Sequence, residues 1–173
     1  MSHIRINTFL FVVMFVVITG LLSVAGGSLA QAQESLDNLP LPRWASIAAK
    51  EVNLRTGPGK RYPIEWVLKK RGLPLEITRE FEHWRMVREP DGATGWVHRS
   101  MLTGNRHVLV ESDEKTLHTN PSEQSGVVAR LRKGVVARVR NCQKQWCRVT
   151  IEDYTGWLTK DNLWGVYAAE TLE

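Results

Sequence analysis

Short runs of alternating apolar and polar residues, separated by turn-forming residues, occupy the chain from about residue 46 onwards. Leu73, Leu75 and Ile77 lie two residues apart, so they share one face of a half-buried strand. No sustained helical period occurs in this region. Strands this short and this regularly interrupted predict small β-barrels and an all-β fold. The expected strands are 64–68, 73–80, 84–88 and 94–97, followed by 127–131, 135–140, 146–151 and 155–158.

The pattern occurs twice, with an offset of about 62 residues, which indicates duplication of one domain. Residues 54–59 read Leu-Arg-Thr-Gly-Pro-Gly and correspond to 117–122, which read Leu-His-Thr-Asn-Pro-Ser. A domain of about 60 residues buries only about 60% of its unfolded surface. Each copy should therefore be marginally stable alone, and should gain from packing on its twin or from a covalent cross-link.

The first 32 residues have the features of an export signal. Arg5 supplies the positive charge, residues 9–18 are an unbroken apolar run, and Ala30 and Ala32 end small-x-small cleavage sites. We expect a signal peptide at 1–32, a linker at 33–45, domains at 46–105 and 107–167, and a C-terminal tail at 168–173. The mature protein would be periplasmic or secreted. An uncleaved signal would instead anchor it in the membrane.

The charge balance excludes one class of partner. The net charge is +5, and basic and acidic residues are spread over both repeats. This is no electrostatic footprint for nucleic acid, so no nucleic-acid partner is expected.

Several motifs together resemble the bacterial SH3-like (SH3b) domain family. They are the segment 52–59, Val-Asn-Leu-Arg-Thr-Gly-Pro-Gly, the basic turn at Gly72, the strand opened by Trp84, and Gly-Trp-Val at 95–97. The chain looks most like the exported tandem SH3-like proteins of Gram-negative bacteria. The resemblance implies two tandem SH3-like barrels of five or six strands each. It is specific for fold and weak for function, because such barrels carry many binding roles.

In related modules attached to wall hydrolases, the barrel holds peptidoglycan while another domain cuts. The sequence contains no HExxH, CxxC or Gly-x-Ser-x-Gly motif. These observations predict a non-catalytic periplasmic binding or scaffolding protein, without metal or cofactor, whose partner is peptidoglycan or an envelope protein. Two alternatives are a wall-active enzyme with an unrecognised site and a membrane-tethered interaction protein.

Aromatic residues are the candidate ligand-binding residues. Trp84 and Trp96 have counterparts in the second repeat, whereas Tyr62 and Trp66 do not. Repeated tryptophans are typical of the core of a small barrel. Alternatively, Tyr62, Trp66, Trp84 and Trp96 rim a groove that takes sugar or peptide by stacking.

Cys142 and Cys147 are the two cysteines of the chain, and export favours a disulfide between them. Simple alternation puts them on opposite faces of the hairpin, so the bridge requires a bulge or an early loop. The first repeat has Glu80 and Arg85 at the corresponding positions, which suggests an exposed ion pair in place of the disulfide.

The signal assignment predicts the mature N-terminus. The protein isolated from its producing cell should begin at Gln31 or Gln33, because cleavage follows Ala30 or Ala32. Intact-mass measurement and N-terminal sequencing check this. A mass equal to the full chain would instead support the membrane anchor.

Overall fold

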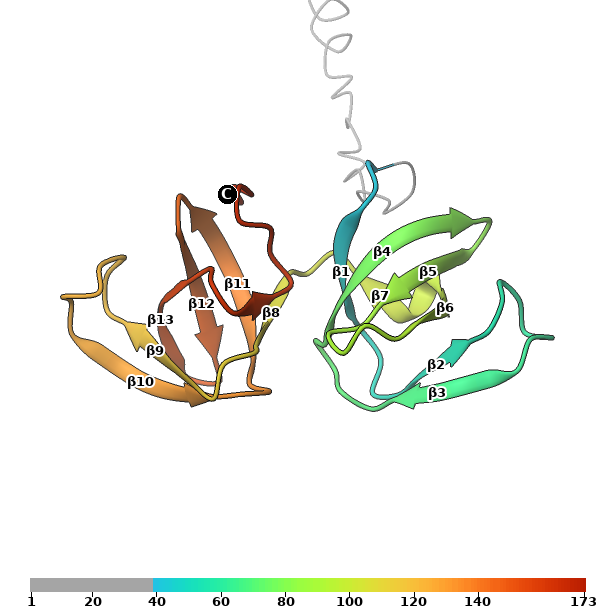
Figure 1. The fold of residues 1–173 in the computed structure, drawn as a ribbon, viewed down its shortest axis with the longest axis horizontal. Coiled ribbons are helices and arrows are strands. Elements are labelled where there is room, and N and C mark those ends of the chain that lie inside the picture. The colour runs from blue at the N-terminus through green and yellow to red at the C-terminus, as the bar shows by residue number, and fades with distance from the viewer. Residues whose placement is uncertain (1–38) are drawn as a thin grey trace, which may run out of the picture. The chain divides into compact units, whose positions relative to one another are not determined.

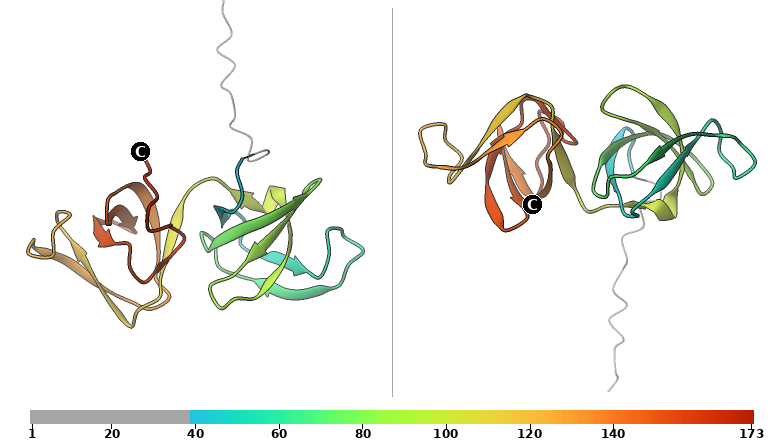
Figure 2. Two further views of the ribbon diagram at one scale, coloured as in Figure 1. Left: turned by 45° about the horizontal axis from the view of Figure 1, so that its top comes forward. Right: turned by 90° about the horizontal axis from the view of Figure 1, so that it is seen from below.

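The computed structural model of the protein describes residues 39–173 (Figure 1). The expected signal peptide and most of the expected linker lie outside this range. The described residues form two seven-stranded antiparallel sheets, and Figure 2 shows each sheet curled around its own interior. The all-β prediction with two tandem SH3-like domains is confirmed. Within residues 39–173, no helix is both long and apolar enough to cross a membrane.

The two sheets repeat the same strand order. The first has the order β3-β2-β6-β5-β4-β1-β7 and the second β10-β9-β13-β12-β11-β8-β14, so each strand has its counterpart seven places later. A 3-10 turn, Arg99–Met101, precedes β7. The strands of the first domain are β1 (Arg43–Ile47), β2 (Val52–Arg55), β3 (Ile64–Leu68), β4 (Pro74–Phe81), β5 (Trp84–Arg88), β6 (Thr94–His98) and β7 (Leu102–Thr103). Those of the second are β8 (His107–Val110), β9 (Glu114–His118), β10 (Val127–Arg132), β11 (Val136–Gln143), β12 (Trp146–Ile151), β13 (Tyr154–Thr159) and β14 (Leu163–Trp164).

Both cores are built from inward-facing aliphatic side chains, and neither contains an aromatic ring. Leu54, Leu75 and Ile77 are fully buried in the first core, where the predicted alternation along 73–77 places the last two. The long strands β4 and β11 each carry a β-bulge, between Ile77 and Arg79 and between Val139 and Asn141. A bulge bends a strand. The bend allows a single long strand to curve around two sides of a small core.

Glycine at the start of the Gly-Trp motif is required by close packing. A Cβ on Gly95 would lie 2.5 Å from Cγ of Leu54, and a Cβ on Gly156 would lie 2.6 Å from the His118 carbonyl oxygen. No side chain fits at either position. This close approach of β6 to β2, and of β13 to β9, explains why both repeats keep glycine there.

The ends of the two domains differ from the expected boundaries. β1 begins at Arg43, and Trp44 and Ala45 are buried, so three residues of the expected linker belong to the first sheet. At the other end, Leu172 and Cys142 exchange backbone hydrogen bonds of 2.8 and 3.0 Å. Glu170 pairs with Arg106 at 2.6 Å. The expected tail is therefore fixed to the second domain.

A disulfide joins Cys142 and Cys147, which face each other directly in the β11–β12 register. The bulge between Val139 and Asn141 shifts β11 by one residue and brings the two side chains to the same face. Both cysteines are buried in the second core. The predicted bridge and the bulge that it needs are confirmed.

An ion-pair cluster occupies the corresponding place in the first domain. Glu80 faces Arg85 across β4 and β5, with 2.9 Å between Oε1 and Nε, and Glu80 also pairs with Arg43 of β1. The Arg85 side chain is only 2% exposed. The predicted pair is present, but the expectation that it is exposed is wrong: one carboxylate neutralises two largely buried guanidinium ions.

Aromatic side chains join the two domains. The ring of Trp44 in β1 lies 4.8 Å from Trp164 of β14, edge to face, and 5.2 Å from Tyr167. Nε1 of Trp164 donates to the Pro74 carbonyl at 3.0 Å. The Tyr167 hydroxyl donates to Glu76 at 2.9 Å, and burial together with this bond raises the pKa of Tyr167. The expected packing of each copy on its twin is thus achieved by aromatic residues outside both repeated cores.

Removal of the disulfide should weaken the protein modestly. Cys142→Ala combined with Cys147→Ala is expected to lower the free energy of unfolding by about 2 kcal/mol, because the bridge closes a short loop in the unfolded chain. Urea unfolding followed by tryptophan fluorescence checks this. An unchanged unfolding midpoint would contradict it.

Removal of the Glu80 charge should lower the free energy of unfolding more than removal of the disulfide does. Glu80→Gln leaves two largely buried guanidinium ions without their carboxylate, and we expect a loss of about 3 kcal/mol in the free energy of unfolding. Glu114→Gln is the matched control, since Glu114 and its partner Arg130 are 62% and 69% exposed. That control should lose less than about 1 kcal/mol. Equal losses in the two variants would show that burial of the Glu80 cluster contributes nothing.

Candidate functional site

The outward face of β2, β6 and β5 carries the first candidate site. Trp84 and Trp96 are half-buried on this face and are absent from the aliphatic core. Register pairing places Trp84 opposite His98 and Trp96 opposite both Met86 and Arg55. The repeated tryptophans therefore lie as half-buried rings on the face of the sheet, outside the aliphatic core.

A pocket of 320 Å³ opens beside Trp84. The Trp84 ring meets the His98 ring edge to face at 5.3 Å, and these two rings form the aromatic wall. Cations and one carboxylate surround them. The lining residues are Glu51, Asn53, Arg55, Lys60, Trp84, His98, Ser100 and Met101.

His98 is held in one orientation by the turn that follows it. Its Nδ1 caps the 3-10 turn by accepting from the Ser100 backbone N–H at 3.3 Å, and it lies 2.7 Å from Oγ of Ser100. Burial lowers the pKa of His98, and the nearby charges of His83 and Lys60 lower it further. Neutral imidazole with an accepting Nδ1 leaves Nε2–H as a donor.

Trp66 and Trp96 line a different pocket, of 430 Å³, on the same domain. The Trp66 ring is 58% exposed on β3. Met86 and the loop residues 92–95 complete this pocket together with Thr56 and Glu65. The predicted aromatic residues are therefore divided between two pockets.

Tyr62 lines neither of these pockets. A Cβ on Gly57 would lie 2.4 Å from the Tyr62 ring, so this ring packs flat on the 57–59 turn. The Tyr62 carbonyl also accepts from Arg55 at 2.8 Å. Tyr62 shapes the loop that presents Lys60. Glycine at 57 serves this contact, and not the unusual backbone angle that a Gly-Pro-Gly turn suggests.

The second domain has a corresponding pocket of 500 Å³ with different chemistry. Trp146 meets His118 edge to face at 5.5 Å, and Glu123 and Asp161 lie on the lining with Gln124, Gln145 and Thr159. Glutamate, aspartate and amide side chains here replace the cations of the first domain. The copies thus differ on the equivalent face.

A buried lysine supports the acidic side of that pocket. Lys115 faces inward where the first repeat has Val52, and its Nζ donates to Thr159 at 2.6 Å and to Asp161 Oδ2 at 2.8 Å. Burial alone would raise the pKa of Asp161, but the hydrogen bond from Lys115 holds it below its ordinary value. Asp161 is therefore a fixed negative charge at neutral pH.

Sequence reasoning missed the polar residues around Trp84. Neither His98 nor Glu51, Asn53 and Ser100 belongs to a recognisable motif. Alternation does place Asn53 and Arg55 on the same outward face of β2. Within residues 39–173 no group of three or more His, Cys, Asp or Glu side chains is placed to hold a metal ion.

The sequence matches the bacterial SH3 domain family twice, over residues 48–104 and 111–165. The chain therefore belongs to this family, and the resemblance inferred from the repeated motifs is confirmed. Each match corresponds to one of the two sheets described above.

The chain is also similar to a curated protein and to two solved structures. The chain is 26% identical over 128 residues to "Putative N-acetylmuramoyl-L-alanine amidase YrvJ" of Bacillus subtilis, covering 68% of this chain and 24% of that protein. NlpC2 from Trichomonas vaginalis aligns with a TM-score of 0.34 and 12% identity over 71% of this chain and 48% of that one. An NlpC/P60 family protein from Bacillus cereus aligns with a TM-score of 0.32 and 18% identity over 70% and 55%.

The match to the amidase corrects the functional prediction. A non-catalytic binding or scaffolding protein that is not an enzyme was expected, and the match to an amidase contradicts it. The alternative of a wall-active enzyme agrees better with this relative. The chain spans about a quarter of the amidase's length. The motifs of a binding domain could not have predicted an enzymatic role, because they specify the fold of the domain and not the activity of the protein that contains it.

Proposed function

We propose that the protein acts in peptidoglycan hydrolysis, and that its tandem SH3 domains hold the wall polymer during that reaction. The match to an N-acetylmuramoyl-L-alanine amidase carries the proposal, because 128 aligned residues are enough to include both SH3 domains. The bond cleaved in such a reaction is the amide between the muramic acid lactyl group and L-alanine. The site described here serves to bind the polymer around that bond.

The pocket beside Trp84 suits this polymer. Peptidoglycan combines sugar rings with peptides that carry free carboxylates and amines. The half-buried Trp84 ring offers a flat apolar surface for a sugar ring or a peptide methyl group. Arg55 and Lys60 can form ion pairs with the carboxylates of the peptide, and Glu51 can form one with an amine.

The proposal requires that the protein reach the wall. The charged, apolar and small-residue segments of 1–32 support export, and the disulfide between Cys142 and Cys147 agrees with an oxidising compartment. We therefore also propose that the mature protein is periplasmic or secreted.

Sedimentation with purified sacculi tests the binding part. The wild type should pellet with sacculi, and Trp84→Ala and Lys60→Gln should each lower the affinity about three- to tenfold, since they remove a stacking surface and an ion contact. Lys133→Gln, an exposed turn position outside this pocket, is the matched control and should bind as the wild type does. Far-UV and near-UV circular dichroism verify that each variant is folded.

Release of soluble peptides from the same sacculi tests the hydrolytic part. Full-length protein should release material with new lactyl carboxyl and L-alanine amino ends. Binding without release would reject hydrolysis by this chain while retaining the wall-binding role. Failure to sediment, together with capture of a protein from an envelope extract, would reject both.

A further inference from the structure

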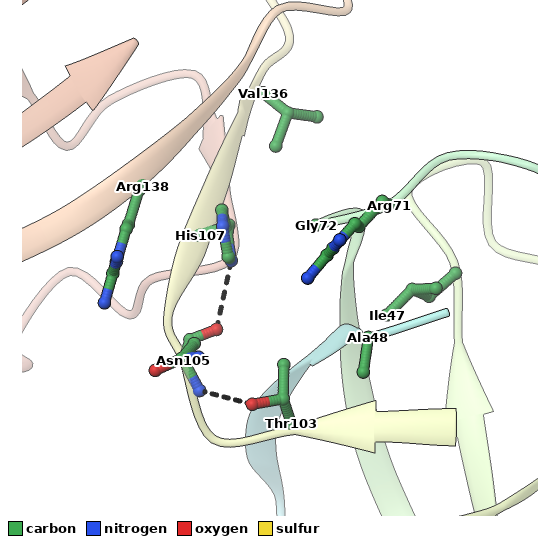
Figure 3. A pocket seen from close by; sticks show the side chains of 9 residues that line it. All are labelled: Ile47, Ala48, Arg71, Gly72, Thr103, Asn105, His107, Val136 and Arg138. Atoms are coloured by element: carbon green, nitrogen blue, oxygen red, sulfur yellow. Dashed lines mark hydrogen bonds between the residues drawn. The ribbon is translucent and has the colours of Figure 1, made fainter. Parts of the chain in front are cut away.

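A pocket of 510 Å³ lies where residues of the first domain meet β8 and β11 of the second. Ile47 and Ala48 follow from β1, and Gly72 lies in the turn before β4 (Figure 3). It is separate from the Trp84 and Trp66 pockets, with which it shares no lining residue.

The pocket carries concentrated positive charge. Arg71 and Arg138 extend from opposite sides with the His107 ring between them (Figure 3). The nine lining residues include no aspartate or glutamate. Within the described part of the chain, neither guanidinium has an ion-pair or hydrogen-bond partner. The buried Arg85 and the half-buried Arg106, by contrast, are each paired with a glutamate.

His107 presents a titratable nitrogen to this pocket. Its Nδ1 lies 3.0 Å from the Asn105 carbonyl oxygen, which can only accept, so Nδ1 carries the proton. Nε2 is therefore the atom that gains a proton on acidification. A Cβ built on Gly72 would lie 3.3 Å from Nε2, which shows that this nitrogen is directed at the turn beside the pocket.

The surroundings of His107 disfavour its charged form. Burial lowers its pKa, the Asn105 carbonyl opposes this shift, and the charges of Arg138 and Arg71 lower the pKa further. From β1 the ring meets only the neutral Ser46, at 3.1 Å. A bound anion would reverse the effect of the two arginines, so anion binding and protonation of His107 should favour each other.

We propose that this junction pocket binds a phosphate monoester. The two guanidinium groups balance the two charges of a phosphate monoester dianion, whereas one carboxylate would leave a charge unmatched. Its volume leaves room for the organic group that carries the phosphate. Contacts that fix the junction support a preformed site: Lys70 donates to the Gly134 carbonyl, and Trp164 to the Pro74 carbonyl. The proposal is independent of wall binding.

Titration with glycerol 3-phosphate at constant ionic strength, by calorimetry and by NMR of the His107 ring, tests the site in the full chain. Saturable binding and a higher His107 pKa in the presence of ligand are expected. Arg71→Gln and Arg138→Gln should each weaken binding about tenfold, because each removes one charge-assisted contact. Arg148→Gln is the matched control, since Arg148 is exposed on β12 and does not line the pocket, and it should bind as the wild type does.

Two comparisons define the ligand further. Vesicles containing phosphatidic acid, measured against pure phosphatidylcholine vesicles, distinguish a lipid phosphate from a soluble one, and either source must depend on Arg71 and Arg138. Acetate should bind much more weakly than the phosphate, because its single charge leaves one guanidinium unmatched. Equal binding of acetate, an equal loss in Arg148→Gln, or an unmoved His107 resonance would overturn the proposal.

Discussion

The small size of each sheet is the constraint on which the rest of the structure depends. A domain of this size encloses only about ten to twelve buried apolar side chains, all of them aliphatic apart from the disulfide. Such a core leaves a small stability margin. The protein adds to it at two places: the link between the fourth and fifth strands of each domain, and the aromatic contact of Trp44 with Trp164 and Tyr167.

The link shows two chemical solutions at one structural position. The second domain uses a covalent bond between Cys142 and Cys147, and the first uses Glu80 between Arg85 and Arg43. Both depend on the bulge that turns the end of the long strand inward. The covalent version acts mainly on the unfolded chain, whereas the ionic version depends on a carboxylate that compensates buried charge. The same backbone thus accepts reducible and non-reducible forms of one restraint.

The repeated residues predicted the fold because they occupy the positions where packing allows the fewest alternatives. Gly95 and Gly156 stand where no side chain fits, and alternation marked the inward faces. The domain contact was not predictable, because Trp44, Trp164 and Tyr167 belong to no repeated motif and meet only after folding. The candidate site was predicted in part: alternation places Trp84 on a face, but the loops that divide that face into separate pockets follow no period. Tyr62 illustrates this, since its ring covers Gly57.

The different linings of the two equivalent pockets have a consequence for recognition. Arg55 and Lys60 surround one, while Glu123 and Asp161 border the other, with Lys115 fixing the charge of Asp161. Two identical binding surfaces in tandem would bind most tightly to a polymer whose units are all alike. Under the proposed wall binding, the tandem would be heterobivalent, and its gain in effective concentration would be largest on a strand whose neighbouring units carry opposite charge. Selectivity of this kind comes from the order of units along a polymer, which neither surface can read alone.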